Sequence, residues 1–228
     1  MSSQSLRNEE REKEHKIPLP NYTLGEELVS SISHGLGAAF GIVALVLCVV
    51  KSVESGSGIS VVSSALYGSM MIILYTMSTI YHALKRNAAK RVFRVFDHCS
   101  IYLLIAGTYI PIVLVAIGGA WGWSFFGVIV GTAILGIVFN AIDVERFKKF
   151  SVVCYIAMGW VIVIGFRPLA NSIDRNGIIL LLAGGVVYTL GAILYGLGKK
   201  AKYLHSIWHF FVLGGSALHF AMIYLYVL

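Results

Sequence analysis

The feature that most constrains this fold is a series of seven long apolar segments, which fill most of the chain. Their expected boundaries are 34–53, 59–82, 96–117, 122–142, 150–167, 177–197 and 205–228. Each is near the ~20 residues that a helix needs to cross a hydrocarbon core. The apolarity is continuous and lacks the alternation of barrel strands. We therefore expect an all-α polytopic membrane protein, a bundle of seven transmembrane helices.

Composition supports a single membrane domain. The chain is 57% hydrophobic and 13% charged, which lies outside the range of soluble globular proteins. Residues 1–22 alternate charges before Pro18 and Pro20, with neither the apolar core nor the cleavage site of a secretory signal peptide. We expect a mobile cytosolic tail at 1–22 and a seven-helix membrane domain at 23–228.

The basic residues predict the orientation of the chain. With seven spans, fifteen of the eighteen Lys and Arg residues fall on the side of the N-terminus, in the tail and in the loops after the second, fourth and sixth segments. The positive-inside rule then places the N-terminus in the cytoplasm and the C-terminus outside. The charge of +7 is thus explained by topology, and nucleic-acid binding is not expected. We expect an integral protein of the plasma membrane, the inner membrane in bacteria, with membrane lipids as partners and no evident soluble protein partner.

Histidines near the cytoplasmic ends of the segments predict a metal site. His205 and His209 are four residues apart at the start of the last segment, so a helix presents both on one face. His82, at the end of the second segment, is the best third ligand. Three histidines with one open position form a catalytic zinc arrangement, in which the metal acidifies a water molecule. Asp97, at the start of the third segment, could then act as general base or orient a ligand.

Several assignments stay open at this stage. Ser78 shares a helical face with His82 and is either a site residue or an ordinary packing serine. Asp97 is alternatively a helix cap paired with Arg91 or Arg94, and Asp143 is a weaker candidate base. The remaining polar residues give weaker predictions. We expect His34 to be an outer residue of the site and Cys99 to be a packing thiol, and Glu26 and Glu27 are either caps or neighbours of the cluster. On a helix, His98 points about 100° away from Asp97, and His219 lies about 15 Å deeper than His209.

These residues together resemble a known family. The pattern comprises Ser78-x-x-x-His82, Phe96-Asp97-His98, the run from Ile101 to Pro111, His205-x-x-x-His209 with His219, and the opening run from Glu26 to Gly35. It is similar to the progestin and adipoQ receptor family, and most closely to its bacterial branch, called hemolysin III-like. The resemblance covers essentially the whole chain after the tail. One departure is Ser30, where bacterial relatives usually carry asparagine.

The resemblance implies a seven-helix fold with zinc near the cytoplasmic face. Position by position, His82, His205 and His209 match the zinc ligands, Asp97 matches the aspartate beside the metal-bound water, and Ser78 matches the serine of the first motif. Eukaryotic relatives are receptors associated with ceramidase-like hydrolysis, and bacterial members are linked to haemolysis by name and to membrane-lipid homeostasis. The leading hypothesis is a zinc-dependent hydrolase of a lipid amide or ester. The alternatives are a membrane-state sensor with structural zinc, a cytolysin and an ion transporter.

Overall fold

The computed structural model describes residues 17–197 and 201–228, so residues 1–16 of the tail predicted at 1–22 lie outside the described residues. The described part is all-helical. Its elements are α2 (Leu24–Glu54), α3 (Gly58–Ala83), α4 (Ala88–Pro111), a π-helix (Ile112–Ile117), α5 (Gly119–Asp143), α6 (Lys148–Trp160), a 3₁₀ turn (Val161–Val163), α7 (Phe166–Ala170), α8 (Arg175–Leu197) and α9 (Leu204–Tyr226). The prediction of an all-α fold is confirmed.

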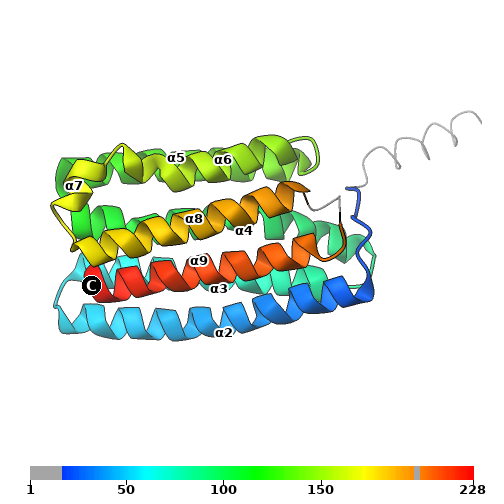
Figure 1. Ribbon diagram of the computed structural model, residues 1–228, viewed down its shortest axis with the longest axis horizontal. Coiled ribbons are helices and arrows are strands. Elements are labelled where there is room, and N and C mark those ends of the chain that lie inside the picture. The colour runs from blue at the N-terminus through cyan, green and yellow to red at the C-terminus, as the bar shows by residue number, and fades with distance from the viewer. Residues whose placement is uncertain (1–16, 198–200) are drawn as a thin grey trace, which may run out of the picture.

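The long helices lie side by side as a bundle (Figure 1). Helix α3 packs extensively against both α2 and α4, α8 packs against α9, and α9 returns to contact α2. In the view of Figure 1, α5, α6 and α7 form the upper layer, and α2 begins at the end of the bundle opposite to that where α9 ends. This arrangement brings the end of α3 next to the beginning of α9.

Two helices begin earlier than the apolar segments predict. Helix α2 starts at Leu24 because Thr23 and Glu26 form a capping box, in which the Thr23 amide donates to Glu26 Oε2 at 2.8 Å. Helix α4 starts at Ala88, where Asn87 Oδ1 accepts a hydrogen bond from the amide of Lys90 at 2.9 Å. These caps add polar turns before the apolar segments that hydropathy predicts. Both added turns contribute residues to the site described below.

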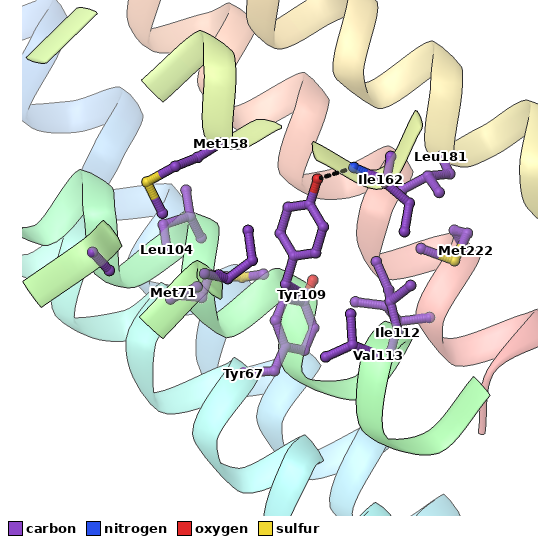
Figure 2. Packing of buried hydrophobic residues seen from close by; sticks show 14 of the residues in the cluster. Tyr67, Met71, Leu104, Tyr109, Ile112, Val113, Met158, Ile162, Leu181 and Met222 are labelled. Carbon is purple, nitrogen blue, oxygen red and sulfur yellow. Dashed lines mark hydrogen bonds between the residues drawn. The ribbon is translucent and has the colours of Figure 1, made fainter. Parts of the chain in front are cut away.

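Among the described residues, six helices are long and apolar enough to cross a membrane: α2, α3, α4 with its π-helical continuation, α5, α8 and α9. The predicted fifth span at 150–167 differs, because the structure divides it into α6, the 3₁₀ turn and α7. The Tyr109 hydroxyl from α4 satisfies backbone groups at this break: it donates to the Gly159 carbonyl at 2.8 Å and accepts from the Ile162 amide at 3.1 Å (Figure 2). Such a partner lets an interrupted helix lie inside a bundle.

Close helix contacts depend on glycine at several positions. A Cβ atom at Gly68 of α3 would lie 2.6 Å from the backbone Cα of Leu45 on α2. At Gly136 of α5, a Cβ would lie 2.1 Å from the ring of Tyr102 on α4. Small residues at such contacts allow helices to approach where apolarity alone does not drive association. Side chains of all the long helices, with others from the π-helix and near the 3₁₀ turn, then fill the core, part of which Figure 2 shows.

Candidate metal centre

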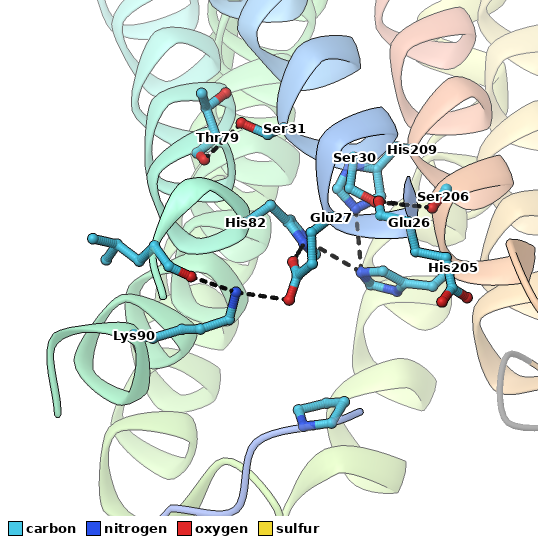
Figure 3. Close-up of polar contacts among 12 residues, drawn as sticks. Glu26, Glu27, Ser30, Ser31, Thr79, His82, Lys90, His205, Ser206 and His209 are labelled. Carbon is cyan, nitrogen blue, oxygen red and sulfur yellow. Dashed lines mark hydrogen bonds and ion pairs between the residues drawn. The ribbon is translucent and has the colours of Figure 1, made fainter. Parts of the chain in front are cut away.

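Three buried imidazoles meet where α3 ends and α9 begins. His205 Nε2 lies 3.2 Å from His82 Nε2 and 3.2 Å from His209 Nε2 (Figure 3). One ligand atom from each of the three residues lies within 4.8 Å of the other two, and each side chain is buried. The sequence prediction that His82 joins the pair on α9 is confirmed as a spatial cluster that could hold a metal ion.

Hydrogen bonding alone does not satisfy this cluster. An imidazole nitrogen has either one N–H or one lone pair. His205 Nε2 nevertheless faces two other nitrogens at the same distance, so it can make a full hydrogen bond with only one of them. If all three nitrogens are deprotonated, their lone pairs point to a common centre, which is the arrangement that a cation requires. The donor set of three imidazoles suits zinc.

Helix α2 holds the beginning of α9 in place. The Ser206 hydroxyl donates to the Glu26 carbonyl at 3.1 Å and lies 3.1 Å from the hydroxyl of Ser30. Just before α9, the amide of Tyr203 donates to Glu26 Oε1 at 2.9 Å, and Tyr203 adopts a left-handed conformation with φ of 64°. The pair of histidines on α9 is thereby fixed against α2 by contacts outside the cluster.

Glu27 contacts His82 on its Nδ1 side, and Lys90 in turn contacts Glu27. Glu27 Oε2 is 2.7 Å from His82 Nδ1, and Glu27 Oε1 is 2.7 Å from Lys90 Nζ (Figure 3). The sequence left Glu27 undecided between a cap and a neighbour of the cluster, because nothing in the spacing relates α2 to the end of α3. The structure places Glu27 against the cluster, whereas Glu26 caps α2.

A segment preceding α2 covers one face of the cluster. The ring of Tyr22 stacks on that of His205, with centroids 4.7 Å apart and an interplanar angle of 11°. Guanidinium groups of Arg86, Arg91 and Arg94 donate to backbone carbonyls between Ile17 and Pro20. Burial raises the pKa of the Tyr22 hydroxyl, so it stays protonated at neutral pH. Sequence reasoning missed Tyr22, and its only signal was an aromatic residue just before a helix cap.

Asp97 and Ser78 are both buried near the cluster. Asp97 is 3% exposed and Ser78 is fully buried, and the Ser78 hydroxyl neighbours the Asp97 carboxyl without completing a hydrogen bond. The alternative of Asp97 as a helix cap is wrong, because Asn87 caps α4 ten residues earlier. Arg94 instead donates to Glu145 at 2.5 Å.

The remaining candidates separate by position. His34 lies beside the cluster, with its ring centroid 3.8 Å from that of His209, but it is not part of the convergent set. His219 Nε2 bonds the Leu181 carbonyl at 3.0 Å, and the ring of His98 lies near Tyr195. The carboxylate of Asp143 accepts from two amides in the turn after α5. The Cys99 thiol donates to the Ile137 carbonyl at 3.7 Å, so it packs as expected.

A cavity of about 120 Å³ opens beside His34, whose ring lies against that of His209, and none of the three clustered histidines lines it. Its walls come mainly from α4, α6, α8 and α9 and are largely apolar, with Ile101, Leu104 and Val212 among them. His34 and Asp97 line the same cavity, as does His219. An apolar space bordered by a carboxyl and imidazoles is suited to an amphiphilic molecule.

Comparison with known proteins agrees with this description. The sequence profile of a family described as "Haemolysin-III related" matches residues 22–220. The chain is 42% identical to Hemolysin-3 of Bacillus cereus over 89% of its own length and 92% of that protein. It is 38% identical to the Hemolysin-3 homolog of Bacillus subtilis (strain 168) over 90% of its own length and 96% of that protein. A human relative, the Monocyte to macrophage differentiation factor, is 25% identical over 73% of this chain and 71% of that protein.

Proposed function

Since the chain belongs to the haemolysin-III related family and is an integral membrane protein, we propose that it is a zinc-dependent hydrolase of the bacterial inner membrane. Its substrate would be a membrane lipid with an amide or ester bond, and its role would be in lipid homeostasis. The observation that carries this proposal is the convergence of the Nε2 atoms of His82, His205 and His209. Zinc bound by three histidines acidifies water and polarises a carbonyl group.

The residues around the cluster divide the remaining work. The Asp97 carboxyl, at the edge of the cavity, takes a proton from the attacking water and returns it to the leaving group. The Ser78 hydroxyl neighbours that carboxyl and would orient it by donating a hydrogen bond to it during turnover. The apolar walls of the cavity hold an acyl chain, so that the scissile bond lies near Asp97 and His34. Because this end of the cavity is buried, bulk water is kept away from the end of the acyl chain that carries the scissile bond.

The topology that fits this proposal has seven spans. Helix α6, the 3₁₀ turn and α7 together would form the fifth crossing, interrupted at Val161–Val163. Support comes from the Tyr109 hydroxyl, which satisfies backbone groups at that interruption. The predicted bias of basic residues then puts the metal site near the cytoplasmic face.

Lipid turnover by the purified protein tests this function. Wild-type protein and Asp97→Asn are reconstituted with bacterial lipids and synthetic ceramide, and released fatty acid is measured. Asp97→Asn should lower the rate by about 10²–10⁴-fold, the typical contribution of a general base, while its zinc content stays unchanged. Equal rates in the two proteins would remove Asp97 from the mechanism, and no turnover by zinc-loaded wild type on any lipid would reject the hydrolase.

The second candidate is a sensor with structural zinc. It is favoured by the segment before α2, in which Tyr22 stacks on His205 and the preceding backbone carbonyls accept from Arg86 and Arg91. In that case Asp97→Asn leaves signalling intact, whereas loss of His209 abolishes it. Cytolysis, suggested by the name of the Bacillus cereus relative, predicts a third result. Liposomes containing the purified protein would then leak ions, and the leak would not depend on His82.

A further inference from the structure

Glu27 lies between a cation and a proposed metal ligand. Its Oε1 is 2.7 Å from Lys90 Nζ, and its Oε2 is 2.7 Å from His82 Nδ1. The side chains of Lys90 and His82 are 1% and 0% exposed, and that of Glu27 is 16% exposed. The three groups form one chain that runs from the start of α4, through α2, to the end of α3 (Figure 3).

The hydrogen-bond roles along this chain follow from the donors. The Lys90 ammonium only donates, and it does so to Glu27 and, at 3.0 Å, to the Leu84 carbonyl. Glu27 as a carboxylate only accepts, so His82 must present an N–H at Nδ1. A neutral imidazole with hydrogen on Nδ1 has its lone pair on Nε2. That is the atom of His82 that faces His205.

We propose that Glu27 is a positioning residue for the metal centre: it holds His82 in the tautomer and ring orientation in which Nε2 binds the ion. Lys90 acts one step further away, by fixing the carboxylate of Glu27. A carboxylate on the outer nitrogen of a metal-binding histidine also makes that histidine a stronger ligand. This inference rests on the zinc site of the proposed function and is independent of whether the protein turns over a lipid.

The neighbouring glutamate has a different task. Glu26 Oε2 accepts from the amide and hydroxyl of Thr23, and its Oε1 accepts from the amide of Tyr203. These contacts cap α2 and attach it to the segment before α9, and none of them involves an imidazole. Successive residues of a helix point about 100° apart, which separates the two roles. Glu26→Gln is therefore a matched control for Glu27→Gln.

Zinc affinity provides the first test. Metal-free wild type, Glu27→Gln and Glu26→Gln are titrated with zinc in competition with a chromophoric chelator. Glu27→Gln should raise the zinc Kd by about 10–100-fold, the range for lost outer partners of metal-binding histidines. Glu26→Gln keeps one side-chain oxygen as acceptor for the Tyr203 amide and loses no contact with an imidazole, so its zinc Kd should stay within about threefold of wild type. Equal zinc affinities of wild type and Glu27→Gln would overturn the proposal.

The tautomer provides a second test, which needs no metal and whose main readout is the wild-type protein. ¹⁵N NMR of histidine-labelled, metal-free wild type, with His82 assigned by its loss in His82→Gln, reports which ring nitrogen carries hydrogen. We expect hydrogen on Nδ1 of His82 in wild type and a mixture of tautomers in Glu27→Gln. Hydrogen on Nε2 in the wild type would contradict the role of Glu27 even if zinc binds. Zinc binding without any effect of Glu27 would reject this inference and leave the proposed hydrolase standing.

Discussion

Helix α9 carries histidines in two settings that differ in what faces their nitrogens. Near its start, His205 and His209 face other imidazole nitrogens at 3.2 Å. Further along, His219 faces the Leu181 carbonyl at 3.0 Å, and a carbonyl only accepts, so Nε2 of His219 carries the hydrogen. All three side chains are buried. Burial of a histidine in an apolar helix therefore does not by itself indicate a metal site, whereas convergence of nitrogen atoms identifies a candidate one.

The comparison predicts opposite metal contents for two alanine substitutions on α9. His209→Ala removes one of three converging ligands and should reduce bound zinc from about one ion per chain to almost none. His219→Ala should leave the zinc content at the wild-type level, because its Nε2 is engaged with a carbonyl. Metal analysis of both purified variants by mass spectrometry checks this. Loss of zinc in His219→Ala would erase the distinction between the two settings.

A substitution on α8 can disrupt the packing of His219 against that helix. A Cβ at Gly184 would lie 2.3 Å from His219 Cδ2, whereas a Cβ at Gly185 meets only Trp160 at 3.8 Å. Gly184→Ala should lower the free energy of unfolding by about 1–3 kcal/mol relative to Gly185→Ala, because overpacking displaces the ring. Both variants gain the same helix propensity, so their difference isolates the clash. Equal stabilities in urea titrations in detergent would show that the ring adjusts freely.

Removing the His219 hydrogen bond should have a smaller effect. His219→Leu replaces the imidazole with an apolar side chain and leaves the Leu181 carbonyl without this donor. We expect a loss of roughly 0.6–1.7 kcal/mol in the free energy of unfolding, the range for side-chain hydrogen bonds between membrane helices. The same titration measures it, and zinc affinity serves as the control. An unchanged stability would mean that this bond contributes nothing measurable.

The cover over the cluster gives the smallest expected effect. Tyr22 stacks on His205, and an aromatic pair of this kind contributes about 0.5–1.5 kcal/mol. Tyr22→Ala should therefore speed the loss of zinc to a chelator by up to about tenfold, and Tyr22→Phe should retain the wild-type rate. Stopped-flow measurement of chelator absorbance provides the rates. If Tyr22→Ala releases zinc no faster than wild type, the segment before α2 does not restrict access to the cluster.

The sequence predicted the helical fold and the three converging histidines because both depend on regular features. Hydropathy marks long apolar helices, and the spacing of His205 and His209 is set by the helical period. It did not predict the break in the fifth segment, which depends on a hydroxyl of Tyr109 from another helix. For the same reason the sequence left the role of Glu27 undecided and gave none for Tyr22. Their roles arise from contacts between segments that no local pattern relates.

The central claim is that the three histidines on α3 and α9 hold one zinc ion. Metal analysis and X-ray absorption of the same purified wild-type sample test it most directly. We predict about one zinc per chain, with three nitrogen ligands at about 2.0–2.1 Å. A folded protein without zinc that also fails to take up added zinc would contradict the claim. So would bound zinc whose spectrum shows sulfur ligands, because His82, His205 and His209 supply only nitrogen.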